Sequence, residues 1–566
     1  MKVILAEKPS VAREIASVLN ATSKKDGYIE GNGYAVTWAF GHLVGLANPD
    51  EYSSDLKSWS MKTLPFIPSE FKLALNKSTG VAKQFNTIKN LFQAADEIIS
   101  GVDSGREGEL IFRYIYDLTG VKNIPIKRLW ISSLTNSAIK AGFNDLRSAD
   151  EYNNLALAAR ARSESDWVVG LNATRAYTVN YSNNTGVLSV GRVQTPVLAM
   201  IVNRDIEIEN FSPEPYWELT SKYRDVIFKY TEGRLDKEEG ANALRDKIVG
   251  ELMTIVEIER KDKSEKPPQL YDLTTLQRQM NSSYSYSATK TLSLLQSLYE
   301  KKFVTYPRTD SRYLTDDIYP ECESILQKLS SLHTGISKLN LSTLRKEKSV
   351  FNDSKVADHH AVIPTGIVPQ GLSSEEQNIF NAILLRFIVV FYPDCKKGMT
   401  TIKGEVTEIK FEAKGVSIMI SGWRELESPG KETTLPVFNK GETGPQIPLV
   451  TKSLTKPPQQ FSEASLLGAM ETAGKDISEP ALKEAMKERG LGTPATRANV
   501  IETLLKREYL VRSKKHLLST AKGRALIELI TVPTLTSPEL TGDWEHKLSL
   551  IESGKMCVDQ FMGEVR

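Results

Sequence analysis

A tyrosine and an arginine two residues apart are the first groups in this sequence that could do chemistry. Tyr306 precedes Pro307, and Arg308 follows directly. Proline biases the residue before it toward an extended backbone, where residues two apart point to the same face. The phenol could therefore attack a phosphate while the guanidinium braces a phosphoryl oxygen. From residues 303–311 alone, a buried tyrosine beside a surface arginine is an equally good interpretation.

Carboxylates follow two predicted strands in the N-terminal part of the chain. One apolar run leads to Glu7 and Lys8, and a second leads to Asp103, with Glu107 four residues later. A helical pattern follows each run, and open α/β sheets bind ligands at the carboxyl ends of such strands. Carboxylate oxygens suit Mg²⁺, which keeps several waters for phosphate. The sequence therefore favours a Mg²⁺ site over three ordinary solvated acids.

Length and composition set the class of protein. The 566 residues exceed a single core, so we expect several domains. The formal net charge is only +2, which by itself does not indicate a nucleic-acid partner. Cys322, Cys395 and Cys557 form no Cys-x-x-Cys pair, which argues against a disulfide framework and a zinc ribbon. No apolar run is long enough for a membrane span, so we expect a soluble cytoplasmic protein.

Periodicity gives a coarse division of the chain. Strand and helix patterns alternate up to about residue 150, and strand-like sequence returns at about 399–455. The charged, proline-terminated run 261–268 predicts a linker, and 274–299 predicts two helices leading to the tyrosine. The sequence stops inside a helix-like pattern, which suggests a shortened or naturally short form.

Taken together, these motifs resemble those of the type IA DNA topoisomerases, most closely the topoisomerase III branch. Residues 1–150 resemble a Toprim domain, with a glutamate after the first strand and a later acidic motif. Four later segments resemble further motifs of the family in the expected order: 162–175, 188–196, 358–365 and 490–497. The resemblance covers essentially the whole chain.

The acidic motif departs from the family pattern at one position. The family's Asp-x-Asp-x-Glu is here residues 103–107, with Gly105 in place of the middle aspartate. We expect weaker Mg²⁺ binding through Asp103, Glu107 and Glu7. Glu109 is a candidate substitute, although an acid in the first turn of a helix is also stabilised by the helix dipole.

The resemblance implies a multidomain α/β protein in which a Toprim domain, helical domains and a β-rich arch form a ring. The expected divisions are 1–150 for the Toprim metal-binding domain, 151–215 and 459–566 for the two parts of a helical DNA-groove domain, 216–284 and 399–458 for the two parts of the arch, and 285–398 for the catalytic tyrosine domain.

The resemblance also implies a mechanism. Tyr306 would cleave one strand and remain on its 5′ phosphate, while Arg308 and Lys8 stabilise the transition-state charge. Glu7 would carry a proton to the leaving 3′ oxygen if neighbouring acids raise its pKa. His359, rather than the adjacent histidine, would hold the phosphate. Mg²⁺ would serve rejoining, and no ATP is expected because no nucleotide-binding loop is present.

The matched motifs also predict the DNA contacts. The candidates are Arg162, Arg175, Ser189, Arg192, Gln194, Thr496 and Arg497. We expect Trp167 to be a core residue rather than a stacking platform. The expected partners are single-stranded DNA, negatively supercoiled or catenated DNA, and a helicase. The expected form is a nucleoid-associated monomer with no membrane contact.

Two alternatives stay open at this level. A Toprim-type metal nuclease or primase would use the acids but leave Tyr306 without a role. A non-catalytic single-strand binding protein would explain the loss of an aspartate at Gly105, but not the joint presence of Lys8, Tyr306 and Arg308. We therefore favour relaxation or decatenation of DNA by strand passage.

Overall fold

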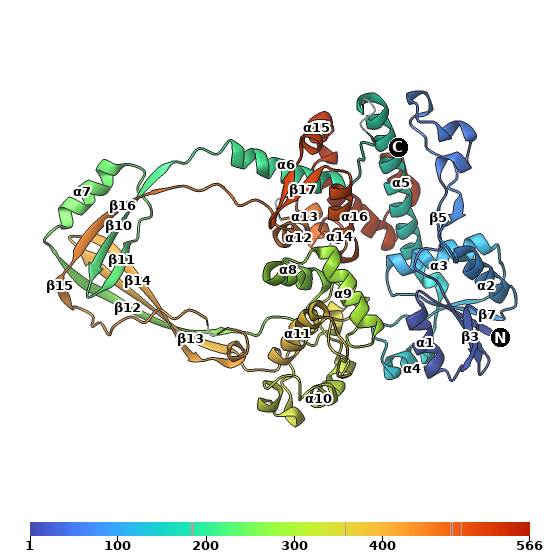
Figure 1. The fold of residues 1–566 in the computed structure, drawn as a ribbon, viewed down its shortest axis with the longest axis horizontal. Coiled ribbons are helices and arrows are strands. Elements are labelled where there is room, and N and C mark those ends of the chain that lie inside the picture. Colours follow the sequence, from blue (N-terminus) through green and yellow to red (C-terminus); the bar gives the residue numbers. More distant parts are fainter. Residues whose placement is uncertain (183–185, 357, 429, 476, 478, 488–489) are drawn as a thin grey trace.

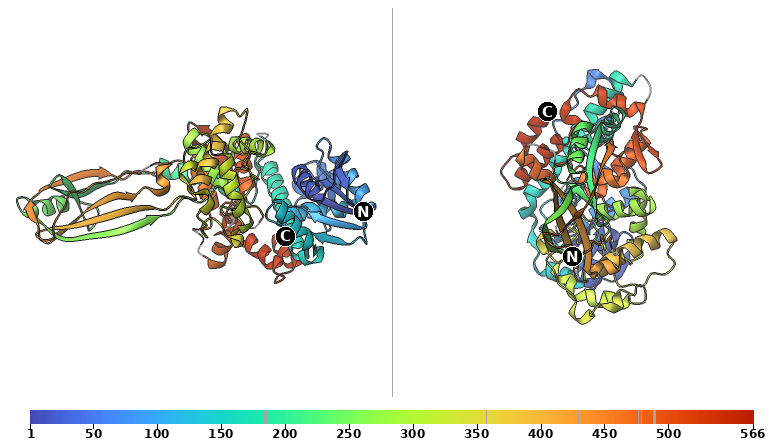
Figure 2. Two further views of the ribbon diagram at one scale, coloured as in Figure 1. Left: turned by 90° about the horizontal axis from the view of Figure 1, so that it is seen from below. Right: turned by 90° about the vertical axis from the view of Figure 1, so that its left-hand side faces the viewer.

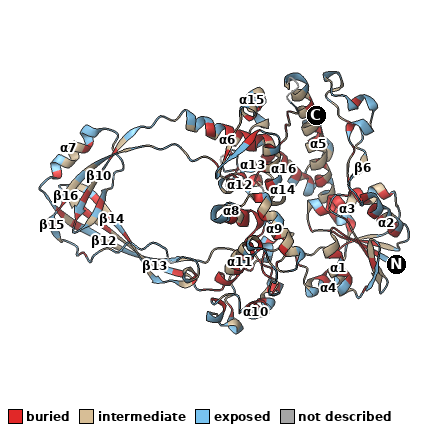
Figure 3. Cartoon of the chain, in the orientation of Figure 1, coloured by how far each residue is buried: buried red, intermediate tan, exposed pale blue. Residues whose placement is uncertain are grey.

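The chain forms a ring in the computed structural model (Figure 1). An α/β domain adjoins a helical body, and a long β-rich arch leaves this body and returns to it. Viewed from below in Figure 2, the arch is thin and projects far from the thicker body. Figure 3 shows buried residues in the α/β domain and the helical parts of the molecule, and also within the sheet of the arch. The structure describes residues 1–182, 186–356, 358–428, 430–475, 477, 479–487 and 490–566.

The N-terminal α/β domain places the predicted acids at the end of two central strands. Its elements are β1 (Lys2–Ala6), α1 (Pro9–Val18), β2 (Ser23–Lys25), β3 (Tyr28–Gly31), β4 (Tyr34–Trp38), β5 (Val44–Leu46), β6 (Leu73–Leu75), α2 (Val81–Gln93), β7 (Glu97–Gly101), α3 (Arg106–Thr119), β8 (Ile126–Arg128), α4 (Asn136–Asn144) and β9 (Arg147–Ser148). The main sheet has the order β2-β3-β4-β1-β7-β8-β9, with β1 and β7 parallel neighbours. Alternate residues of β1 pack on opposite faces, Val3 in one hydrophobic cluster and Ile4 in another. Because helices cover both faces, the strand is apolar from Val3 to Ala6.

The helical body combines two segments that are far apart in the sequence. Its elements are α5 (Asn153–Tyr181), α6 (Gln194–Glu209), α12 (Glu463–Glu471), α13 (Pro480–Lys487), α14 (Pro494–Lys506), β17 (Leu510–Ser513), β18 (His516–Ser519), α15 (Ala521–Leu529), α16 (Glu539–Glu552) and α17 (Val558–Val565). Leu198 of α6 shares a buried core with Leu466 of α12. Ala161 of α5 shares another with Trp544 of α16. These two cores hold together the segments before and after the arch. Ala288, which lies between the two halves of the arch sequence, also belongs to the first core, so this core closes the ring.

The arch is a single antiparallel sheet with the order β15-β12-β13-β14-β11-β10-β16. Its elements are β10 (Pro215–Tyr223), β11 (Val226–Tyr230), α7 (Glu238–Ile248), β12 (Leu252–Glu265), β13 (Cys395–Val406), β14 (Ile409–Ile420), β15 (Thr443–Pro445) and β16 (Ile447–Leu454). The predicted linker at 261–268 is wrong in its first part, because β12 continues to Glu265, which pairs with Cys395 of β13. Charged side chains fit an exposed ribbon of this kind, and backbone pairing with β13 overrides their weak strand propensity.

The tyrosine domain lies between the two halves of the arch sequence. Its helices are α8 (Leu273–Tyr284), α9 (Ala288–Glu300), α10 (Tyr319–Lys328) and α11 (Ser374–Val389), and α8 and α9 confirm the two helices predicted at 274–299. Its core already includes Leu270 and Leu276, together with Leu295 of α9. The predicted boundary at residue 285 is therefore too late. The reason is that α8 buries one face against α9. Periodicity alone predicts that α8 has an apolar face, but not whether this face packs against the arch or against the tyrosine domain.

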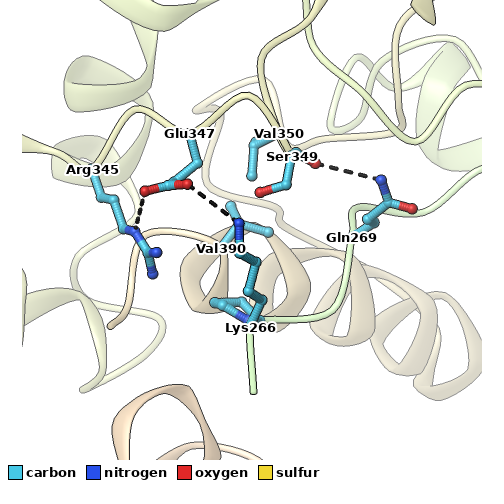
Figure 4. A pocket seen from close by; sticks show the side chains of 8 residues that line it. Lys266, Gln269, Arg345, Glu347, Ser349, Val350 and Val390 are labelled. Atoms are coloured by element: carbon cyan, nitrogen blue, oxygen red, sulfur yellow. Dashed lines mark hydrogen bonds and ion pairs between the residues drawn. The ribbon is translucent and has the colours of Figure 1, made fainter. Parts of the chain in front are cut away.

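A small polar pocket marks the place where the arch joins the tyrosine domain (Figure 4). Lys266, just after β12, and Arg345 both contact Glu347, at 3.8 and 3.1 Å. Arg345 also forms an ion pair with Asp394, just before β13, at 2.7 Å. One arginine therefore links both connections of the arch to this domain. Separately, no helix in the described ranges is both long and apolar enough to cross a bilayer.

We expect Leu198→Ala to destabilise the closed ring. The side chain is fully buried, so truncation should cost about 2–5 kcal/mol through lost burial and a cavity. Thermal unfolding and limited proteolysis would measure this loss. Leu157→Ala is the control, because that leucine is 44% exposed. Equal melting temperatures for the two variants would contradict the shared core.

Candidate active site

Backbone pairing brings the tyrosine segment and the histidine segment together. Val304 pairs with Pro364 in an antiparallel bridge. The Thr309 hydroxyl donates a hydrogen bond to the carbonyl oxygen of His359 at 2.7 Å. As a result, the ring centroids of Tyr306 and His359 lie 4.3 Å apart. Two motifs separated by about fifty residues thus form one wall of the site.

Lys8 connects this wall to the α/β domain. Its ammonium nitrogen lies 2.7 Å from the Tyr306 hydroxyl, 3.0 Å from Asp103 Oδ2 and 2.9 Å from Glu7 Oε1. Glu7 and Lys8 directly follow β1, and Asp103 lies two residues after β7. Because these strands are parallel neighbours, their carboxyl ends place all three side chains at one edge of the sheet. The nucleophile, the cation and two acids therefore meet across an interface between two domains.

Further contacts fix the two rings. His359 Nε2 lies 3.1 Å from Asp103 Oδ2. The ring of Tyr299 meets that of Tyr306 edge-on at 5.5 Å, and its hydroxyl lies 3.2 Å from Ser10 Oγ. Aromatic pairs of this geometry add specificity to packing. Tyr299 was not predicted from the sequence, because an aromatic residue at the end of a helix carries no separate signal.

Burial and neighbouring charges set the protonation states. Burial, followed by the charge of Asp103, raises the pKa of Glu7. Burial also raises the pKa of Tyr306, although Lys8 opposes this. For Lys8, burial by itself would lower the pKa, but Asp103 and Glu7 raise it well above its usual value. The phenol is therefore neutral at neutral pH, and the ammonium donates its hydrogen bond to the phenol oxygen.

Arg308 lies apart from this network. Its side chain is exposed and forms no hydrogen bond or ion pair with any residue that the structure describes. Tyr306 and Arg308 form no hydrogen bond with each other in the part of the chain that the structure describes. Their shared contact with one phosphate stays a prediction. The guanidinium is therefore available to an anion that reaches Tyr306.

Comparison with known proteins decides the family. Residues 2–134 match the Toprim domain family, and residues 150–563 match the family described as DNA topoisomerase. The chain is 40% identical to DNA topoisomerase 3 of Bacillus subtilis and to DNA topoisomerase 3 of Bacillus cereus, over its whole length and 80% of theirs. The chain belongs to the type IA DNA topoisomerases. The alternatives of a metal nuclease and a binding protein are not supported.

A solved structure shows the same fold. Full-length topoisomerase I from Thermotoga maritima matches with a TM-score of 0.72 and 24% identity, covering the whole of this chain and 88% of that one. The toroidal arrangement predicted from the motifs is therefore confirmed for this topoisomerase.

The carboxylates of this topoisomerase do not form a ready metal site. Toprim domains typically bind a divalent metal, and carboxylate oxygens are the appropriate donors. However, within the described residues no three His, Cys, Asp or Glu side chains converge on one point. The ammonium of Lys8 already contacts Glu7 and Asp103, and Glu107 is hydrogen-bonded to His42 instead. Carboxylate oxygens are suitable ligands for a hard cation such as Mg²⁺. In this structure, however, the three carboxylates are held by other side chains and do not converge on one point.

The position of the missing aspartate is also filled. A Cβ atom placed on Gly105 would lie 2.7 Å from Oδ2 and 2.8 Å from Oδ1 of Asp358. Asp358 was not predicted as a site residue, although it directly precedes His359 in the matched motif. Glu109, the suggested substitute ligand, is fully buried, and its carboxylate forms ion pairs with Arg113 at 2.8 Å and Arg128 at 3.3 Å. It therefore has a structural role in this arrangement.

Three of the predicted DNA-contacting arginines are buried and bonded within the protein. Arg192 donates hydrogen bonds to both oxygens of Asp166, at 2.8 and 3.1 Å. Arg175 donates to the carbonyl oxygen of Leu56 at 2.8 Å. Arg497 donates to a threonine hydroxyl on α8 at 2.9 Å. Their role in DNA binding stays a prediction, and it would require these bonds to exchange.

The remaining predicted DNA contacts are more accessible. Arg162 lies 3.7 Å from Glu545, and its side chain is 27% exposed. Gln194 donates a hydrogen bond to the Ser189 hydroxyl at 2.8 Å. Thr496 is exposed at the start of α14. The indole at position 167 meets three aromatic rings within 6.3 Å, in agreement with a packing role.

We expect Lys8→Met to reduce strand cleavage by roughly 10²-fold or more, because the phenol oxygen loses the ammonium that donates to it and two acids lose their cation. Formation of a covalent protein–oligonucleotide adduct on a denaturing gel would measure this. Lys302→Met is a matched control from the same interface, since its 2.8 Å ion pair with Glu14 is exposed. Similar cleavage by both variants would contradict the role of Lys8.

Proposed function

We propose that this chain is an ATP-independent topoisomerase that cleaves one DNA strand with Tyr306, passes another strand through the break and rejoins the first. The observation that carries the proposal is the 2.7 Å contact between Lys8 Nζ and the Tyr306 hydroxyl, made between two different domains. It combines a protein nucleophile with a charge that stabilises the attacked phosphate. It also places the reacting group on an interface that can separate.

The proposed chemistry is a transesterification. The Tyr306 oxygen forms a bond to phosphorus, and the bond from phosphorus to the 3′ oxygen breaks. The phenol releases its proton to solvent, and Glu7 delivers its own proton to the leaving 3′ oxygen, so that Glu7 becomes ionised until rejoining. The raised pKa of Glu7 supports this, because a general acid must hold its proton until the transition state. The reverse steps rejoin the strand.

Charge stabilisation comes from the two basic side chains. Lys8 is positioned against the phenol, and the exposed guanidinium of Arg308 can bind a phosphoryl oxygen. The negative charge that develops on these oxygens is the main barrier to phosphoryl transfer. Because the phosphotyrosine bond replaces the broken phosphodiester, no nucleotide is needed to reseal the strand.

Strand passage requires the interface to open. The contacts of Lys8 with Tyr306 and of His359 with Asp103 join the two domains, so opening must break both. The covalent bond holds the 5′ end on the tyrosine domain, while the α/β domain retains Glu7 and Asp103. The ring in Figure 1 provides an enclosed space on the other side of the tyrosine domain.

The metal and the partners complete the proposal. We assign Mg²⁺ to Glu7, Asp103 and Glu107 after Lys8 and His42 release them; when bound, it would supply positive charge at the 3′ end during rejoining. We also propose that the protein acts as a monomer on single-stranded, negatively supercoiled or catenated DNA, in the nucleoid and with a helicase partner. The family motifs support the assignments of the metal and of DNA, whereas the location, the monomeric form and the helicase follow only from the resemblance to this branch of the family.

We expect relaxation of negatively supercoiled plasmid with Mg²⁺ and without ATP, and none with Tyr306→Phe, because phenylalanine keeps the ring contacts but removes the nucleophile. Agarose gels of topoisomers would measure this. Tyr299→Phe is the matched control, since it removes only a hydroxyl that contacts Ser10. Cutting that persists in Tyr306→Phe would overturn the assignment.

We expect the cleavage rate to fall as pH rises through the raised pKa of Glu7, because only the protonated acid can supply the leaving oxygen. Glu7→Gln should lower the single-turnover rate by roughly 10²- to 10⁴-fold and flatten this pH dependence. Rates measured over a pH series on an oligonucleotide substrate would show it. A wild-type rate that rises with pH would instead make Glu7 a base.

A further inference from the structure

We propose that Asp358 is a positioning residue that docks the tyrosine domain on the N-terminal end of helix α3, and that Gly105 is needed because the carboxylate of Asp358 fills the space of its absent side chain. The inference rests on the proposed function, since the docked interface is the one that carries Tyr306. It gives Gly105 a role that does not concern metal binding.

Backbone conformation does not explain the glycine. Gly105 precedes α3 with φ −164° and ψ −179°, an extended conformation that any residue can adopt. Space does explain it. A Cβ there would approach the two carboxylate oxygens of Asp358 to 2.7 and 2.8 Å and Cγ to 3.0 Å. To relieve these contacts, the Asp358 side chain would have to turn or shift away from Gly105, which would withdraw its carboxylate from the start of α3.

The start of α3 is an appropriate surface for a carboxylate. The first N–H groups of a helix lack partners within it and carry partial positive charge. Gly105, which precedes the first turn, has no side chain with which to cap these groups. Burial, together with Asp310, Asp103 and Glu7, raises the pKa of Asp358 to about 7, while His359 opposes this shift. Partial positive charge at the start of α3 would favour the ionised form of Asp358 in the same way as His359.

This docking contact acts on the catalytic groups through the chain. Asp358 directly precedes His359, which contacts Asp103 at 3.1 Å and packs its ring on that of Tyr306. The backbone of His359 in turn accepts the hydrogen bond from Thr309 on the tyrosine segment. Placing Asp358 against Gly105 thus sets how closely the nucleophile approaches Lys8. Asp358 itself touches no reacting atom in this arrangement.

A double-mutant cycle of Gly105→Ala and Asp358→Ala tests the proposal by thermal unfolding. Alanine in place of an extended glycine ordinarily raises stability by restricting the unfolded chain. We expect Gly105→Ala to lower the melting temperature in the wild-type background and to raise it in the Asp358→Ala background. Gly45→Ala is the matched control, because that glycine is in a strand with nothing within 4 Å of its added Cβ.

The same cycle on oligonucleotide cleavage tests the positioning role. We expect Gly105→Ala and Gly105→Asp to lower the covalent adduct yield by roughly tenfold, and Asp358→Ala to restore most of it in the double variants, because contacting sites are not additive. A separate structural requirement for glycine would give no such rescue. Additive effects in both assays, or full cleavage by Gly105→Asp alone, would overturn the proposal.

The two assays distinguish a failure of the proposed function from a failure of the docking role of Asp358. If the wild type forms no adduct while single-strand binding is intact, the proposed reaction is wrong, yet the reversal of sign in thermal unfolding would still establish the contact between Asp358 and Gly105. If the adduct forms and depends on Tyr306 but the cycle is additive, the reaction holds and the docking role is wrong.

Discussion

The structure of the active site depends on one buried cation between two acids. Glu7 and Asp103 are placed side by side because β1 and β7 are parallel neighbours. Two largely buried carboxylates at such a distance repel each other, and burying charge is costly unless it is paired. Lys8 supplies the pairing, with both carboxylates within 3.0 Å. Even with Lys8 in place, burial and the charge of Asp103 raise the pKa of Glu7.

The same ammonium group ties catalysis to closure of the domains. Its third contact is the hydroxyl of Tyr306, which belongs to another domain and approaches only when the interface is closed. A partly desolvated ammonium group is stabilised most when each of its N–H groups has an acceptor. In the closed arrangement, the phenol therefore completes the contacts of Lys8. In the proposed mechanism, opening the interface would separate the nucleophile from its charge stabiliser while another strand passes.

Two of the arginines predicted to contact DNA lie close to acidic side chains of the protein itself. Arg192 is paired with Asp166, and the buried Glu545 lies 3.6 Å from it and 3.7 Å from Arg162. These pairs satisfy charges that would otherwise be buried without partners. A phosphate could replace a carboxylate only if the helices that carry these acids move. The carboxylates of α5 and α16 therefore pair with the arginines that, by the prediction, would bind the phosphates of DNA.

The sequence by itself determined the fold class and the family. Apolar runs that end near Glu7 and Asp103 identified the strands and the edge where they meet, and the segment around Tyr306 supplied the candidate nucleophile. These are local signals, carried by residue type and spacing within a few positions. They were sufficient because each strand and helix start is set by neighbouring residues, and because the motifs follow one another in the family's order.

Only the tertiary structure decided which groups meet. The pairing of Lys8 with Tyr306 joins residues nearly three hundred positions apart, and the contact of Asp358 with Gly105 joins two domains. The inclusion of α8 in the tyrosine domain and the continuation of β12 through a charged run likewise depend on partners elsewhere in the chain. Spacing in the sequence cannot reveal such contacts, because packing between distant segments selects them, and the free energy of that packing depends on shape and burial rather than on local pattern.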